Sequence, residues 1–400
     1  MSQYKMLTDF FASKNLDIRK NGNNPRFLDQ KCTPDVVSFI ADCILQLSKQ
    51  SFQRNDIWQH NYFVKNATFI FGKPSPNNHK AAHEYDKVIL QPLDMLAYAG
   101  ILEKRKNNRR KNIFILKEKS ILEFISINEM NAFHFLYVYL DKFARDSSFY
   151  SYVSDFLKKQ NADSFNILKD KFIKFLLANS QIGTRGSKNN GTVEIKRIFS
   201  KFINVFAVYY RKQGTEKGHL SKGIFLMSDL MYNRLNFRDI KKLKNITRQE
   251  QKQAKYSKPA VNRKFLMQKA IKWVKQHHKY SEVFDKYHGQ TAQIHHIFPK
   301  NKFPMISYYI ENLIALTAGQ HADYAHPNSN TNKINLQYQK ICLHAKHNTI
   351  NSELANGETP YNIFNFMFVL KTGFQDKNID VPINSTNSDI TKIIDTYYLP

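Results

Sequence analysis

Hydrophobic and polar positions recur along most of the chain with a helical period, and short runs alternate with a strand period. Thr33 and Pro34 provide a cap and a first turn for a helix. Its expected apolar face comprises Val36, Val37, Ile40, Ile44 and Leu47. A short helix over 56–63 follows, and then a longer one over 81–99 that Pro92 kinks or splits and Gly100 ends. The first third is therefore expected to be helical.

Residues 101–106 and 109–116 have strand-like composition and flank the polar turn at 107–108, which predicts a hairpin. Its cationic tip contains Arg105, Lys106, Arg109 and Arg110. Helices followed by a basic hairpin predict a winged-helix-like DNA-recognition domain over 1–125. In that arrangement the last helix enters the major groove and the hairpin touches the backbone. The alternative is a small helical domain whose hairpin is merely solvated.

Residues 126–255 are expected to form a helical middle region. Ser126 and Glu129 match a capping box ahead of apolar positions up to Phe143. Further helices are expected around 165–176, and over about 193–212 with buried Ile195, Ile198, Phe199, Phe202, Val205 and Phe206. The loop 183–191 contains Arg185 and Lys188, and it either contacts a phosphate backbone or is a surface connection.

The net charge of the chain indicates which class of molecule it binds. Sixty Lys plus Arg against 33 Asp plus Glu give a formal net charge of +27. This excess indicates a polyanionic partner, with a solubilising surface as the alternative. Over 234–279, a segment that includes Lys258, basic residues outnumber the two acids Asp239 and Glu250. Such one-sided charge favours a surface that follows a nucleic-acid backbone.

The three cysteines, the start of the chain and the lack of long apolar runs bear on the cellular compartment. An odd, sparse cysteine set is typical of a reducing environment, and the first residues lack the layout of a signal peptide. No apolar run approaches membrane-spanning length. The sequence therefore predicts a cytoplasmic protein with no membrane partner.

The last region, 256–400, contains the clearest chemical pattern. Two adjacent histidines, His295 and His296, end a strand-like stretch at 291–298. Asn312 begins an apolar strand over 312–317, and His321 lies in a helix-like segment over 319–325. Imidazole is the side chain best suited to accept a proton near neutral pH, and it is also a common metal ligand. Strand, long loop, strand and short helix are thus predicted to carry histidines and one asparagine.

This pattern, covering roughly 290–330, resembles the HNH nucleases, also called His-Me finger or ββα-metal nucleases. The resemblance implies that His296 is the general base and that His295 and His321 hold a divalent metal. It also implies that Asn312 holds the loop through backbone hydrogen bonds. Some relatives have a further histidine four residues beyond the helix ligand, where this chain has Ala325; His326, one position later, is the expected third ligand.

The resemblance implies one divalent ion per site, with Mg²⁺ expected first and Mn²⁺ or another transition metal as alternatives. In many relatives the first histidine is an aspartate, and a neutral ligand suits softer metals better. Because neighbouring strand residues point to opposite faces, His295 and His296 can flank one phosphate only if the strand end twists or bulges. Lys300 and the polar loop with Asn328 are expected to contact DNA.

Two other histidine groups are weaker candidates. The pair His277 and His278 is taken as a surface feature, because two adjacent histidines alone are not specific. Cys342, His344 and His347 offer three zinc-type ligands without a convincing fourth.

The whole chain is therefore expected to be mainly α with small β elements (α+β), with a C-terminal ββα-metal HNH nuclease domain. Its plan resembles type II restriction endonucleases, which cut double-stranded DNA at specific sites and leave 5′-phosphates. A separate recognition module favours the type IIS subclass. The resemblance leaves open a homodimer at cleavage and implies a companion DNA methyltransferase that acts on the same site. The alternatives are a less specific HNH nuclease and a winged-helix DNA-binding regulator that does not cleave.

Overall fold

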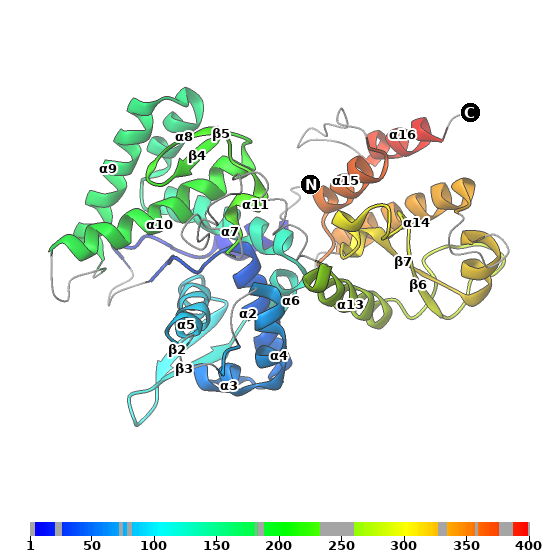
Figure 1. Ribbon diagram of the computed structural model, residues 1–400, viewed down its shortest axis with the longest axis horizontal. Helices are drawn as coiled ribbons and strands as arrows, with labels where there is room; N and C mark the ends of the chain where they lie inside the picture. Colours follow the sequence, from blue (N-terminus) through cyan, green and yellow to red (C-terminus); the bar gives the residue numbers. More distant parts are fainter. Residues whose placement is uncertain are drawn as a thin grey trace, which may run out of the picture. The chain divides into compact units, whose positions relative to one another are not determined.

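The computed structural model shows a mainly helical α+β protein with small antiparallel sheets (Figure 1). It describes residues 5–20, 26–71, 75–77, 82–180, 182, 188–232, 260–326, 334–356, 359–375 and 387–398, without the side chains of 5, 69, 188–190, 260–263 and 387. The chain divides into two compact units, Met1–Lys242 and Leu243–Pro400. Within the described residues, no helix has both the length and the apolar character needed to cross a membrane.

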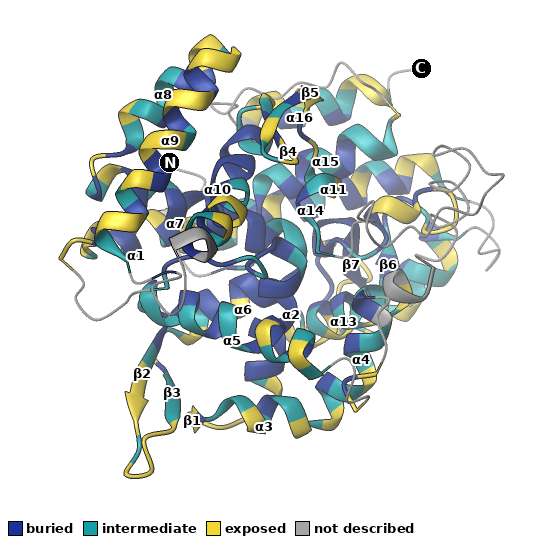
Figure 2. Ribbon diagram, turned by 60° about the vertical axis from the view of Figure 1, so that its left-hand side comes forward, coloured by how far each residue is buried: buried dark blue, intermediate teal, exposed yellow. Residues whose placement is uncertain are grey.

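The first half of unit 1 contains helices and one three-stranded sheet. Its elements are α1 (Lys5–Ala12), α2 (Pro34–Gln46), β1 (Ser51–Phe52), α3 (Arg54–Gln59), α4 (Asn61–Phe71), α5 (Ala82–Tyr98), β2 (Leu102–Lys106) and β3 (Asn112–Leu116). The expected hairpin is confirmed, and β1 adds to it, giving the strand order β1-β3-β2. The tip of this hairpin is exposed (Figure 2).

Of two helix predictions in this half, one is wrong and the other is confirmed. The helix expected over 56–63 is wrong, because the extended backbone of His60 separates α3 from α4. The helix expected over 81–99 is present as α5, and Pro92 lies inside it without splitting it. Gly100 follows with a φ of +80°, a conformation that favours glycine at a helix end.

The second half of unit 1 is built on long helices. Its elements are α6 (Lys119–Ile127), α7 (Glu129–Asp146), α8 (Tyr150–Lys159), α9 (Ala162–Asn179), α10 (Lys188–Tyr209), β4 (Gln213–Glu216), β5 (His219–Ile224) and α11 (Met227–Leu230). The expected apolar positions of α10 are all buried. Ser126 does not cap α7: the side chain of Asn128 accepts a hydrogen bond from the Asn131 amide, and Ser126 belongs to α6.

The segments before and after residue 125 share a core. Helix α2 packs against both α6 and α7, and the ring of Phe27 stacks on Phe143 with centroids 3.9 Å apart. The structure thus shows one compact unit over 1–242, and the finer division at 125 stays a prediction.

Unit 2 surrounds a two-stranded antiparallel sheet with helices. Its elements are α13 (Ala260–His277), β6 (Gln293–His296), η2 (Pro304–Ile306), η3 (Ile310–Asn312), β7 (Leu313–Leu316), η4 (Gln320–Ala325), α14 (Leu336–Asn356), α15 (Ile363–Gly373) and α16 (Asn387–Tyr397). Helix α13 packs on β6 and β7. All four residues of β7 are fully buried, so this strand is the centre of the unit's core.

The pair Thr359 and Pro360 has the residue types of a helix cap and first turn and predicts that the last helix begins there. The structure differs: α15 begins at Ile363 with the Asn362 side chain as its cap. A further helix, α16, follows and packs against α14.

Candidate active site and metal centre

The strand pair β6–β7 positions the two adjacent histidines. His295 pairs with Ile314 and His296 with Leu313 in regular antiparallel register. Along β6 the residues point to alternate faces: His295 is buried at 7% exposure, whereas His296 is half-buried. The two imidazoles therefore have different neighbours although they are adjacent in sequence.

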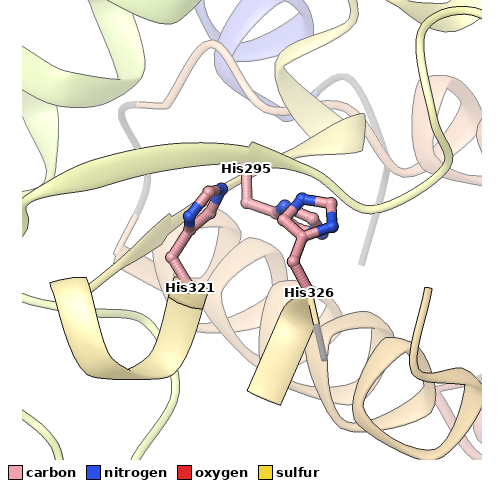
Figure 3. Close-up of side chains that lie close together, drawn as sticks. All are labelled: His295, His321 and His326. Atoms are coloured by element: carbon pink, nitrogen blue, oxygen red, sulfur yellow. The ribbon is translucent and has the colours of Figure 1, made fainter. Parts of the chain in front are cut away.

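His295 lies with His321 and His326 in one cluster (Figure 3). One ring nitrogen from each of the three lies within 4.8 Å of the others. The ring centroids are 5.4 Å apart for His295 and His321, and 4.9 Å apart for each pair that includes His326. The strand β6 thus contributes one potential ligand, and η4 with the residue after it contributes two.

The shape of η4 explains why His326 reaches the cluster. The His326 amide donates a hydrogen bond to the His321 carbonyl at 3.2 Å, which is the five-residue spacing of a π-type turn. In this wider turn, residues five apart share a face, whereas an ordinary α-turn brings residues four apart together. Ala325, the fourth residue, is buried instead. The turn therefore places His326 beside His321.

The surroundings of the cluster lower the pKa of two of its imidazoles. Burial, followed by the proximity of His326 and His321, lowers the pKa of His295 to about 3. Burial and His326 also lower the pKa of His321. Three imidazoles with converging nitrogens form the donor set of open His₃ metal sites, in which water or substrate takes the fourth position. Such nitrogens suit Zn²⁺ and similar transition metals, whereas Mg²⁺ prefers oxygen ligands.

His296 is held by the loop between the strands. Its Nε2 lies 3.0 Å from the carbonyl oxygen of Ser307. A carbonyl oxygen can only accept, so Nε2 carries the hydrogen and Nδ1 is the basic nitrogen. Burial lowers the pKa of His296 to about 4, against the opposing effect of the Ser307 bond and with a further lowering by Lys300. The ring is thus neutral at pH 7 and able to accept a proton.

Asn312 connects the two ends of that loop. It is fully buried, and its Oδ1 accepts a hydrogen bond from the Phe298 amide at 2.9 Å. Its Nδ2 donates to the carbonyl oxygens of Phe298 at 3.0 Å and Ile306 at 3.2 Å. Because Ile306 immediately precedes Ser307, these bonds also fix the backbone that orients the His296 ring.

Two residues that support the candidate site could not be identified from the sequence pattern. Ser307 acts through its main-chain carbonyl, which any residue provides. Gln320 is fully buried; its Nε2 donates to the Val283 carbonyl at 3.0 Å and to Asp285 Oδ1 at 2.8 Å. It therefore anchors the first residue of η4 to the segment before β6.

The second cluster with metal-ligand spacing contains His277, His278 and Glu353. His278 is half-buried, so the expectation that both histidines are surface features is wrong for it. Its Nε2 lies 2.7 Å from the Tyr361 hydroxyl, and His277 Nε2 lies 2.9 Å from Glu353 Oε1. These ring nitrogens already have protein partners.

The Cys342 group does not form a metal cluster in the described part of the chain. Cys342 is buried, His344 pairs with Asp395 and His347 bonds to Asn351.

The residues expected to touch DNA lie at several places. Arg105, Lys106, Arg109 and Arg110 are exposed at the hairpin tip, and Lys300 is exposed after β6. Arg105 forms an ion pair with Glu103. The predictions for Arg185, Lys258 and Asn328 fall outside the described residues, as does the side chain of Lys188, the first residue of α10.

Comparisons with protein-family models, curated proteins and solved structures found no match for this chain.

Proposed function

We propose that this chain is a metal-dependent DNA endonuclease of the HNH type, acting as a sequence-specific type II restriction enzyme. The observation that carries the proposal is the convergence of His295, His321 and His326 beside a separately oriented His296. A ligand cluster and a neutral base are the two parts that phosphodiester hydrolysis requires. No bulge separates His295 from His296 in the strand register, so the proposal requires the twist at the end of β6 to bring both imidazoles to one phosphate.

In the proposed reaction, Nδ1 of His296 accepts a proton from the water that attacks phosphorus. The new P–O bond forms as the bond to the 3′-oxygen breaks in line. The leaving 3′-oxygen takes a proton from solvent, so the products are a 5′-phosphate and a 3′-hydroxyl. Asn312 and the Ser307 carbonyl keep the imidazole in the required tautomer and orientation. A divalent cation held by the three clustered histidines would neutralise charge on the phosphate and on the leaving oxygen.

The N-terminal unit supports a recognition role. Its sheet combines one short strand with a hairpin whose cationic tip is exposed, as a winged-helix module requires for backbone contacts. The three acids of α5 do not add free negative charge, because Glu84, Asp86 and Asp94 pair with Lys31, Arg54 and Lys104. A recognition module joined to a nuclease unit favours the type IIS plan.

The test is a digest of unmethylated phage-sized DNA with Mg²⁺, Mn²⁺, Zn²⁺ or EDTA, followed by sequencing of fragment ends. We expect discrete, metal-dependent fragments with 5′-phosphates. His296→Ala is expected to slow cleavage by about 10²–10⁴-fold while DNA binding and folding persist. His219→Ala, at an exposed histidine of β5, is the matched control and should cleave normally.

Each other result has a definite meaning. A smear in place of bands would favour the non-specific nuclease. DNA that stays intact in every metal but shifts on a gel would favour the winged-helix regulator. Unchanged cleavage by His296→Ala would refute the proposed mechanism.

A further inference from the structure

The segment between α13 and β6 exposes aromatic side chains that a folded core would ordinarily cover. Phe284 is 84% exposed and Tyr280 is 60% exposed. The exposed ring of His288 lies parallel to both, at 4.3 Å from Phe284 and 6.3 Å from Tyr280 between centroids, with interplanar angles of 16° and 22°. We call these three rings the aromatic stack. Single exposed apolar side chains are common, but a contiguous group of exposed rings is more typical of an interaction site.

The loop that carries the stack is fixed by hydrogen bonds. The amide of Ser281 donates to the Gly289 carbonyl at 2.9 Å, and that of Thr291 donates to the Lys279 carbonyl at 3.0 Å. The Glu282 amide donates to the Ala315 carbonyl of β7 at 2.9 Å. The exposed position of Phe284 is thus part of a defined backbone conformation.

The same loop is tied to the turn that holds two potential metal ligands. Gln320, which directly precedes His321, bonds to the Val283 carbonyl and to Asp285. The ring of Tyr287 packs on Tyr324, which lies between His321 and His326, with centroids 5.3 Å apart. The aromatic stack is therefore attached to the candidate metal centre through direct contacts within unit 2.

The chemistry of the loop fits nucleic acid. Lys279 and Lys286 are exposed beside the stack, and neither has an ion pair among the residues that the structure describes. Of the two acids in the loop, Glu282 is buried and bonds to Lys346. The other, Asp285, accepts hydrogen bonds from the side chain of Gln320 and from the Tyr287 amide. Aromatic rings flanked by cations are how proteins stack on bases while they contact phosphates.

We propose that Phe284, supported by the rings of His288 and Tyr280, inserts into the base stack of duplex DNA beside the phosphate that His296 faces. This inference rests on the proposed function. Apolar wedges of this kind unstack a base step and bend the duplex, which widens access to the backbone. Phe284 would then be a positioning residue, because it acts on the shape of the substrate and not on the reacting atoms.

The experiment measures DNA unwinding without cleavage. Closed circular plasmid is relaxed by a metal-independent topoisomerase in EDTA with increasing protein, and the topoisomer distribution is read on a gel. We expect the wild-type chain to unwind the plasmid and Phe284→Ala to lose that unwinding, with DNA affinity within about tenfold of wild type. Phe284→Trp should retain unwinding. Met305→Ala, which removes a side chain of 54% exposure elsewhere in unit 2, is the matched control.

Phe284→Trp also reports the contact directly. Its indole should be quenched by iodide in the free protein and become shielded when a mixed-sequence 40-base-pair duplex is added in EDTA. The wild-type chain, with Trp58 and Trp273 only, gives the background. Single-turnover cleavage by Phe284→Ala in metal is expected to be about tenfold slower or worse.

The outcomes separate the two proposals. Unwinding that depends on Phe284 without any cleavage supports the wedge and refutes the nuclease. Cleavage of DNA together with full unwinding by Phe284→Ala refutes the wedge alone. An indole of Phe284→Trp that stays accessible to iodide in the complex has the same meaning. An effect of Phe284→Ala on self-association, with unwinding unchanged, also refutes it and assigns the stack to a second copy of the chain. Failure to bind the plasmid at all refutes both.

Discussion

The two adjacent-histidine pairs of unit 2 have the same sequence but opposite chemistry. His277 and His278 end a helix, and His295 and His296 end a strand. At the first pair, the Tyr361 hydroxyl lies 2.7 Å from Nε2 of His278 and accepts a hydrogen bond from Lys346 Nζ at 3.0 Å. Nε2 of His278 therefore has a side chain as its partner. At the second pair, Nε2 of His296 donates to the main-chain carbonyl of Ser307, so Nδ1 is the nitrogen that can accept a proton.

The difference shows that the hydrogen-bond partner of the ring, and not the histidine itself, decides which ring nitrogen can accept a proton. Burial lowers the pKa of both His278 and His296 to about 4, so protonation state alone does not separate them. The first pair lies against the acids Glu282 and Glu353 and the buried ammonium of Lys346. The histidine cluster that contains His295 includes no acid among the described residues.

The largest expected effect is a loss of stability when the buried cation beside His277 and His278 is removed. Lys346 is fully buried and pairs with Glu282, which is also buried. Lys346→Ala leaves that carboxylate without its cation, so we expect a loss of about 3–5 kcal/mol in the free energy of unfolding. Urea denaturation measures it.

A double variant isolates the charge effect. Lys346→Met with Glu282→Gln removes both charges and should recover most of the stability. Lys340→Ala removes the cation of the exposed pair with Asp395 and is expected to change stability by less than about 1 kcal/mol. Equal losses from Lys346→Ala and Lys340→Ala would contradict this account of the buried pair.

The next largest effect is on metal affinity, and it tests which of the two histidine groups binds metal. His295→Ala removes one of the three proposed ligands, so we expect the affinity for Zn²⁺ or Co²⁺ to fall by more than about 100-fold. Changing a residue that only supports a ligand usually has a smaller effect. His278→Ala should leave that affinity unchanged. Titration calorimetry and the visible absorption of bound Co²⁺ provide the measurements. Metal uptake that depends on His278 and not on His295 would reverse the assignment.

The smallest effect is a pH dependence at the first pair. Burial lowers the pKa of His278 from 6.5 to about 4, although Glu282 opposes the shift. Between these values the unfolded chain binds a proton that the folded chain does not, so stability falls as the pH decreases from 6.5. At pH 5 this amounts to a loss on the order of 2 kcal/mol.

His278→Gln should therefore flatten the stability profile between pH 6.5 and 5, as measured by urea denaturation at each pH. His277→Gln, at the exposed member of the pair, is the matched control and should retain the slope. Identical slopes for wild type and His278→Gln would refute a buried neutral imidazole at this position.

Helical periodicity predicted most of the long helices, because an apolar stripe must be buried whatever the partner. The helix containing Phe165 and the one containing Phe202 are examples, and both are present as α9 and α10. The exact helix ends were less predictable. Ser126 and Asn128 are both suitable caps, and only the packing of α6 against α7 decides that Asn128 caps the helix.

The candidate site, too, was predictable from the sequence only in part. The spacing of His295, His296, Asn312 and His321 is visible in the sequence, because a strand and a following turn bring such positions together by local geometry. The sequence therefore determined by itself a histidine-rich ββα-like pattern, a largely helical chain and a strongly basic charge. Residue types and local periods are sufficient for these.

Only the tertiary structure decided which partners the ring nitrogens have. The Ser307 carbonyl that orients His296 and the Tyr361 hydroxyl beside His278 come from other segments of the chain. The π-type turn that brings in His326 is a local feature, but the pattern of residue types does not distinguish it from an α-turn. The tertiary structure likewise decided that Phe284 remains exposed on a fixed loop. The physical reason is that hydrogen-bond partners and burial are set by how segments pack, and these contacts leave no periodic signal in the chain.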